Sequence, residues 1–151
     1  METQSKSSIY GTIFLSNYAR QIFFLLFEFD FFKKQMSDPA NLIHFEGTLD
    51  ELFQKIYDHP GLTVLKYGST RCPPCKRLNQ MLPAIATDNE TVLFLCVELD
   101  LHRELGGDYG INSVPTVMFF RGKGEDGKPH ELARIVGLKV PEIKAKIAEL
   151  K

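Results

Sequence analysis

The sequence predicts an α/β fold in which helices cover both faces of a central mixed β-sheet. Stretches rich in β-forming residues alternate along the chain with amphipathic stretches of helical spacing. One β-rich stretch, residues 92–99, is almost continuously apolar, as is typical of a strand buried on both faces of a sheet. The chain of 151 residues fits one domain with a single hydrophobic core.

The first half of the predicted domain contains strand, helix and strand. A short strand is expected at residues 41–45, and Thr48 followed by Glu51 forms a capping-box pattern that begins a helix. Apolar residues recur on one face of that helix until His59-Pro60-Gly61 ends it. Residues 62–67 are again rich in β-formers and predict the second strand.

The second half begins with a helix at residues 73–87, in which Pro83 predicts a kink. A strand at 92–99 and a short helix at 101–105, ended by two glycines, come next. Strands at 115–120 and 131–136 flank a polar, glycine-rich hairpin loop, and a helix at 141–150 has proline in its first turn. This order of elements requires a mixed sheet between helices.

Composition excludes some classes of partner. Charged residues make up 25% of the chain and hydrophobic residues 44%, the balance of an ordinary soluble globular protein. The net charge of −1 gives no electrostatic case for binding nucleic acid or an anionic membrane. We expect neither partner, and we expect a monomer.

Residues 1–35 differ from the rest of the chain. They contain the apolar run of residues 22–27, but Arg20, Glu28 and Asp30 interrupt it, so a membrane-spanning helix of about 20 apolar residues is not expected. Ordinary globular patterning begins shortly after Met36, and we expect the domain to be 36–151. Three interpretations of 1–35 stay open: a start assigned too early, a membrane or targeting segment, or an extra amphipathic helix.

The residues that carry chemistry are Cys72-Pro73-Pro74-Cys75, between a predicted strand and the helix it opens. Residues at i and i+3 of a helical turn have Cα atoms about 5–6 Å apart, within the range of about 4.4–6.8 Å that a disulfide accepts. The helix N-terminus favours a thiolate at Cys72, which is the nucleophile in thiol–disulfide exchange. Pro73 and Pro74 remove two backbone N–H donors near this sulfur and stiffen the loop.

Zinc binding is the competing interpretation of these cysteines. A structural zinc site needs four Cys or His ligands, and the chain has no second Cys-x-x-Cys pair and only four scattered histidines. We therefore expect no metal. The third cysteine, Cys96, lies in the apolar stretch 91–97 and is expected to be a buried structural residue.

Over residues 41–150 the chain resembles the thioredoxin family. The strongest element is Cys72-Pro73-Pro74-Cys75-Lys76 after the strand of residues 63–67. The segment 109–116, which contains Val114-Pro115, is similar to the family's segment with a cis-proline. Val136-Gly137-Leu138 is similar to the glycine bend on the family's substrate-facing rim. These three motifs occur in the family's order and at its separations.

The resemblance implies roles for the matched positions. Cys72 would be the attacking cysteine and Cys75 the resolving one. Pro115 would be cis, and Val114 would offer backbone hydrogen bonds to an extended segment of the substrate. Val114, Gly137 and Leu138 would form an apolar patch that docks a protein partner.

Two of the departures from the family pattern bear on the cysteine chemistry. Arg71, where most thioredoxins have tryptophan, places a cation beside Cys72, which should lower the pKa of its thiol and favour partners with acidic surfaces. Lys66 occupies the position of a buried aspartate thought to assist proton transfer at the resolving thiol. If buried, Lys66 must pair or lose its charge, and Glu98 is the candidate partner. One hypothesis is that Lys66 stabilises a thiolate and shifts proton handling; the alternative is that it extends to water and has little effect.

The sequence thus favours a dithiol reductase of the thioredoxin type that acts on disulfide-containing proteins. A flavin-containing thioredoxin reductase would regenerate the dithiol with NADPH, so that FAD and NADPH belong to that partner and the chain itself needs no bound cofactor. A cytoplasmic location follows if residues 1–35 are absent or inert. The alternatives are an oxidase or isomerase of secreted proteins, and a binding or scaffold module with the same fold.

Overall fold

Five strands form one mixed sheet, in the order β1-β3-β2-β4-β5, in a computed structural model that describes residues 38–151. β1, β3 and β2 run parallel, whereas β4 is antiparallel to both β2 and β5. The elements are β1 (Leu42–His44), α2 (Leu49–Asp58), β2 (Thr63–Gly68), α3 (Pro73–Thr87), β3 (Leu93–Glu98), the 3₁₀-helix η1 (Arg103–Tyr109), β4 (Thr116–Lys123), β5 (Pro129–Val136) and α4 (Val140–Leu150).

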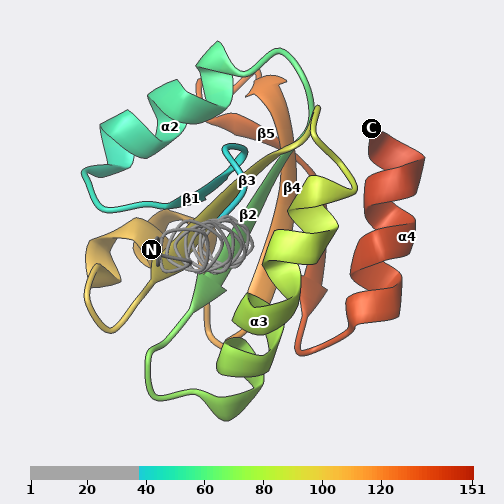
Figure 1. Ribbon diagram of the computed structural model, residues 1–151. Coiled ribbons are helices and arrows are strands. Elements are labelled where there is room, and N and C mark those ends of the chain that lie inside the picture. The colour runs from blue at the N-terminus through green and yellow to red at the C-terminus, as the bar shows by residue number, and fades with distance from the viewer. Residues whose placement is uncertain (1–37) are drawn as a thin grey trace, which may run out of the picture. The chain divides into compact units, whose positions relative to one another are not determined.

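Helices cover both faces of this sheet, as the sequence predicts. Figure 1 shows α2 on one face and α3 and α4 on the other. The central strand β2 is buried along its whole length. Side chains alternate between the two faces of a strand, so that Val64 packs under α3 and α4 while Leu65 packs under α2.

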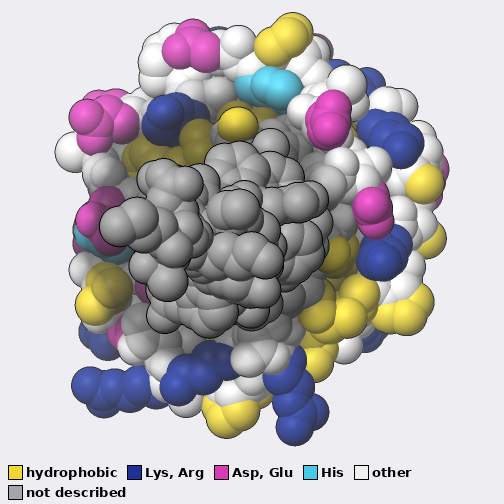
Figure 2. Space-filling model, in the orientation of Figure 1, with side chains coloured by type: hydrophobic (Ala, Val, Ile, Leu, Met, Phe, Trp, Pro, Cys, Tyr) yellow, Lys and Arg dark blue, Asp and Glu magenta, His cyan; other side chains and the backbone are white. Residues whose placement is uncertain are grey.

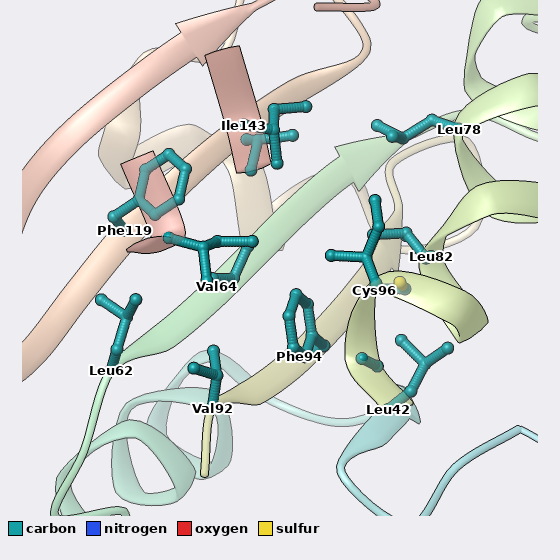
Figure 3. Packing of buried hydrophobic residues seen from close by; sticks show 14 of the residues in the cluster. Leu42, Leu62, Val64, Leu78, Leu82, Val92, Phe94, Cys96, Phe119 and Ile143 are labelled. Carbon is teal, nitrogen blue, oxygen red and sulfur yellow. The ribbon is translucent and has the colours of Figure 1, made fainter. Parts of the chain in front are cut away.

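Each face has its own hydrophobic cluster. The cluster under α3 and α4, part of which Figure 3 shows, places Cys96 among apolar side chains of β1, β3 and α3. Its α-helical members are Leu78, Leu82, Ile85, Ala86, Ile143 and Ile147. The cluster under α2 uses Leu52 and Ile56, which are fully buried. By strand alternation Lys66 and Glu98 lie on the face that α3 covers, two residues beyond Val64 and Cys96.

The capping box at the start of α2 is confirmed. The Thr48 backbone N–H donates to Glu51 Oε2 at 2.8 Å, and the Glu51 N–H donates to the Thr48 hydroxyl at 3.3 Å. The bounds of α3 also agree with the prediction, and Pro83 lies inside this helix. Its first turn therefore places both motif cysteines where the sequence puts them.

The predicted bounds differ most from the structure at three elements. The short helix expected at 101–105 is η1, which runs through both glycines to Tyr109 and ends at Gly110 with φ +58°. Gly106 is buried, and a Cβ there would lie 2.8 Å from the Leu99 side chain. This glycine therefore allows close packing rather than ending the helix. β4 and β5 also extend further into the hairpin than expected, to Lys123 and from Pro129.

The predictions for residues 1–35 and for a domain boundary at Met36 lie outside the described residues. Within 38–151, none of the helices has the length and apolar character needed to cross a membrane.

Asn41 ties the start of the domain to the end of α3. Its side-chain amide donates to the carbonyl oxygens of Ala86, Asn89 and Val92 at 2.9, 3.0 and 2.9 Å.

We expect Asn41→Ala to lower the free energy of unfolding by about 1–3 kcal/mol, because these three partly buried carbonyl oxygens lose their donor. Urea unfolding measures this. Asn112→Ala, an exposed control, should change it by under about 0.5 kcal/mol; equal effects would contradict the role of Asn41.

Candidate functional site

The site begins where β2 ends and α3 begins. The connecting residues 69–71 are held by Asp100, whose carboxylate accepts hydrogen bonds from the Thr70 hydroxyl and from its backbone N–H at 3.1 Å. These hydrogen bonds, with that of the hydroxyl the stronger, hold the pKa of Asp100 below its usual value. Cys72 N–H also donates to Ser69 O at 3.2 Å. The turn therefore fixes Cys72 as the N-cap of α3.

Cys72 and Cys75 are joined by a disulfide with their Cα atoms 5.2 Å apart, inside the range expected from their spacing. Cys72 is half-buried, whereas Cys75 is fully buried. The Cys75 backbone N–H lies 3.3 Å from Cys72 Sγ and points toward it. Within this pair Cys72 is the sulfur that another protein can reach, and one N–H donor remains for it even though Pro73 and Pro74 supply none.

The proline segment lies against the disulfide. The Val114–Pro115 peptide bond is cis, as the resemblance implies, and the carbonyl oxygen of Val114 is 3.7 Å from Cys72 Sγ. Gly137, with φ +90°, donates its N–H to the carbonyl of Pro115 at 2.7 Å. Cys72, Val114, Pro115 and Gly137 are thus brought together from three separate parts of the chain.

The rest of the predicted rim is only partly available at the surface. Leu138 is half-buried and packs against the core under α3 and α4. Val136, one residue before Gly137, is 47% exposed and supplies apolar surface at this edge. On the other side of Val114 lies an open groove of about 510 Å³, lined by Ser69, Leu99, Asp100, Arg103, Ile111 and Val114 among others.

Lys66 is buried beneath this site and forms an ion pair. Its side chain is 1% exposed, and Nζ lies 2.5 Å from Glu98 Oε1, with Glu98 17% exposed. The alternative that Lys66 extends to water is therefore wrong, and Glu98 is its partner. Gly68 leaves room for the Lys66 side chain to reach Glu98, because a Cβ at position 68 would lie 2.5 Å from Lys66 Cε.

Asn79 links this ion pair to the cysteine helix. Asn79 Nδ2 donates to Glu98 Oε1 at 3.3 Å, and Asn79 follows Cys75 by four residues on the same face of α3. Glu98 Oε2 and Asn79 Oδ1 are both buried and have no hydrogen-bond partner among residues 38–151. The cluster under the cysteines therefore contains acceptor oxygens with unused capacity.

The remaining predicted residues differ in environment. Arg71 is exposed, and its side chain makes no hydrogen bond or ion pair with the described part of the chain. Cys96 is buried as expected, and its burial raises the pKa of its thiol to about 12, although the charge of Lys66 acts in the opposite direction. Between residues 38 and 151 no group of three or more His, Cys, Asp or Glu side chains could hold a metal ion.

Sequence reasoning missed three residues of the site: Gly68, Asn79 and Asp100. The helical spacing of Asn79 from Cys75 was a usable signal, because it places the amide on the face of α3 that carries the buried cysteine. Gly68 could be understood only once Lys66 was known to be buried. The contact of Asp100 with Thr70 joins residues 30 apart, and no local pattern indicates it.

The Lys66–Glu98 pair can be tested by exchanging its charges. We expect Lys66→Asp to place two carboxylates together and lower the free energy of unfolding by about 3 kcal/mol, the lower end for a buried pair because Glu98 keeps some exposure. Adding Glu98→Lys should restore most of the loss. Urea unfolding of both variants measures this, and a double variant no more stable than Lys66→Asp would show that the ion pair is not the determining contact.

The different environments of the cysteines predict different reactivities. At pH 8 the reduced, folded protein should react with iodoacetamide at Cys72, whereas Cys96 has almost no thiolate about four pH units below its pKa of about 12. Cys96 should react only after unfolding in denaturant. Peptide mass spectrometry identifies the modified residue, and alkylation of Cys96 at a rate near that of Cys72 would contradict its burial.

Comparisons with known proteins agree with this geometry. The family model described as Thioredoxin matches residues 44–147. Thioredoxin H1 of Arabidopsis thaliana is 30% identical over 106 residues, which cover 70% of this chain and 88% of that protein. The structure of Trichomonas vaginalis thioredoxin superimposes with a TM-score of 0.69 and 35% identity, covering 75% of this chain and 100% of the other.

Longer proteins are similar as well. TPR repeat-containing thioredoxin TDX of Arabidopsis thaliana is 33% identical over 88 residues, or 58% of this chain, and the chain spans only 22% of the length of that relative. The family match, the fold and the Cys72–Cys75 pair together support thiol–disulfide oxidoreductase activity in general. On the strength of the family model and the similar folds, the chain belongs to the thioredoxin family.

Proposed function

We propose that the chain is a protein-disulfide reductase of the thioredoxin type. The observation that carries the proposal is the disulfide at the start of α3, in which Cys72 is partly exposed beside a cis-proline and Cys75 is buried. This asymmetry gives the two cysteines different roles: Cys72 attacks the target disulfide, and Cys75 resolves the mixed disulfide.

The reaction takes two exchange steps. The Cys72 thiolate attacks one sulfur of a target disulfide, forms a mixed disulfide and releases the other target sulfur as a thiolate. Cys75, as thiolate, then attacks Cys72 Sγ, which releases the second target sulfur and forms the Cys72–Cys75 disulfide. Two electrons pass from the dithiol to the target. The Cys75 N–H and the N-terminus of α3 stabilise the Cys72 thiolate, and the exposed Arg71 next to it adds a positive charge.

Cys75 must lose its proton inside the protein, because it is fully buried. We assign Glu98 as the group that receives this proton. Asn79 lies on the same face of α3 as Cys75 and donates a hydrogen bond to Glu98 Oε1, which places the carboxylate next to that face. Lys66 Nζ contacts the same carboxylate at 2.5 Å. In this assignment the carboxylate comes from β3, whereas in the family pattern it comes from position 66 on β2.

The target segment would lie extended along the proline segment. Val114 supplies backbone hydrogen-bonding groups, Pro115 and Gly137 hold that edge in place, and Leu138 contributes part of the apolar surface behind it. Exposed apolar surface beside a reactive group is suited to docking a protein rather than a small polar molecule. We therefore propose disulfide-containing proteins as the targets.

Electrons would come from outside the chain. We propose that a thioredoxin reductase, with its own FAD, transfers them from NADPH to the Cys72–Cys75 disulfide, and that this cycle operates in the cytoplasm. The chain itself would need no bound cofactor, since the disulfide is the redox group.

Reduction of insulin disulfides tests the proposal. We expect the full chain, supplied with NADPH and a thioredoxin reductase, to reduce insulin, and Cys72→Ser to lower the rate by at least about 100-fold because the nucleophile is lost. NADPH consumption measures the rate. Cys75→Ser should instead accumulate a mixed disulfide between Cys72 and insulin, visible by non-reducing electrophoresis.

Two results would count against the proposal. The reductase role is wrong if the Cys72–Cys75 disulfide forms and is opened by dithiothreitol, but the wild-type chain reduces insulin neither with dithiothreitol nor with NADPH and a thioredoxin reductase. If Cys72→Ser retains the wild-type rate, Cys72 is not the attacking residue. Cys96→Ser is the matched control and should keep the wild-type rate, because Cys96 is buried away from solvent.

A further inference from the structure

Positive charge is concentrated around the active-site motif. The chain as a whole has a net charge of −1, yet residues 69–87 contain Arg71, Lys76 and Arg77 and no acidic residue. Arg103 joins them in space, because it lines the groove next to Val114 and Ser69. We call these four residues the basic rim. Figure 2 shows Lys and Arg side chains gathered at the lower edge of the molecule, where α3 begins in Figure 1.

The basic rim is exposed and makes no internal ion pairs. All four side chains are exposed, and none forms a salt bridge with another residue in 38–151. Three other exposed or half-exposed cations, Arg134, Lys139 and Lys146, each contact a nearby glutamate. Asp100, the acidic residue in the groove with Arg103, already accepts hydrogen bonds from Thr70.

Local stability does not explain these cations. The positive end of the helix dipole lies at the N-terminus of α3, where acidic residues stabilise a helix and cations do not. The first turn of α3 has no acidic residue, and Lys76 and Arg77 follow directly after Cys75. α2 has the usual arrangement, with Asp50 and Glu51 in its first turn and Lys55 in its last.

We propose that the basic rim selects disulfide partners whose reactive cysteines are flanked by Asp and Glu residues. The inference rests on the proposed function, because a protein seated on Cys72 and on the backbone of Val114 would bring its neighbouring residues over Arg71 on one side and Arg103 on the other. A partner with acidic flanks would meet four cations that form no ion pair within the described domain. A partner with basic flanks would be repelled.

Charges at the edge of an interface act mainly on association. They raise the rate of productive encounter, and their effect falls as salt increases. The expected signature is therefore a difference in kcat/KM between acidic and basic targets that is large at low ionic strength and small at high ionic strength. The exchange chemistry itself should not change.

The test uses three synthetic disulfide-linked peptides that differ only in the residues flanking the cysteine: acidic, neutral or basic. We expect the full-length, pre-reduced protein to reduce the acidic peptide about tenfold faster than the basic one at 20 mM salt, and about twofold or less at 0.5 M. Lys76→Glu/Arg77→Glu should reverse the preference at low salt. Lys76→Gln/Arg77→Gln should reduce it to a few-fold. Arg71 is left unchanged, because it also affects the Cys72 thiol.

The matched control is Lys55→Glu/Lys144→Glu, which changes the net charge equally but on exposed positions of α2 and α4. It should keep the preference for the acidic peptide. The neutral peptide should react at the same rate with every variant, which shows that the site is intact. If the neutral peptide is not reduced at all, the proposed function fails.

If the neutral peptide is reduced but wild type treats acidic and basic peptides alike, the selection by charge is wrong. It is also wrong if the Lys55/Lys144 control loses the preference as fully as the Lys76/Arg77 variant, since charge anywhere on the domain would then suffice. Binding of heparin that depends on Lys76 and Arg77, without any preference among the peptides, would overturn the protein-partner inference in favour of a polyanion.

Discussion

The placement of the α3 N-terminus at the end of β2 is the constraint on which the rest of the site depends. β2 is buried on both faces, so its end is fixed in space by the core. The turn that follows is held by Asp100, and the helix then begins with Cys72 as its N-cap. Because the helix starts there, Cys72 Sγ faces Val114 and the first turn turns Cys75 inward.

The proline segment completes this geometry from the other side. β4 pairs with β2, so the residues just before β4 necessarily arrive beside the start of α3. The cis bond at Val114–Pro115 and the hydrogen bond from Gly137 to Pro115 hold the backbone edge against the disulfide. On the proposed function, a target bound along this edge would present its sulfur to Cys72 and not to the buried Cys75.

Much of this was accessible from the sequence, because it is encoded locally. The cap of α2, the bounds of α3 and the spacing of the cysteine pair each depend on residues within a few positions of one another. The nearly continuous apolar stretch at residues 92–99 also predicted a strand buried on both faces of the sheet. The end of the short helix was predicted wrongly because side-chain packing decides it: Gly106 was expected to end the helix, but it packs closely against Leu99.

The buried Lys66–Glu98 ion pair also depends on packing that the sequence alone does not determine. The sequence posed the alternatives for Lys66, but it could not choose between them, since a lysine on a strand can either pair or extend to water. The structure chooses the first, because Gly68 leaves room for the side chain to turn toward Glu98. The side-chain amide of Asn79 then connects the pair to α3, a contact that depends on how the helix lies on the sheet.

Positive charge thus lies in two places around the cysteine pair: buried beneath it at Lys66, and exposed beside it in the basic rim. The two differ in how strongly salt screens them. Lys66 is almost completely removed from water, so its interaction with Glu98 is little affected by dissolved ions. The basic rim is exposed and is screened by salt over about 10 Å at 0.1 M. On the proposed function, a change at Lys76, Arg77 or Arg103 would alter which partners approach, whereas a change at Lys66 or Glu98 would alter the chemistry for every partner alike. The two electrostatic effects should therefore differ in their dependence on salt.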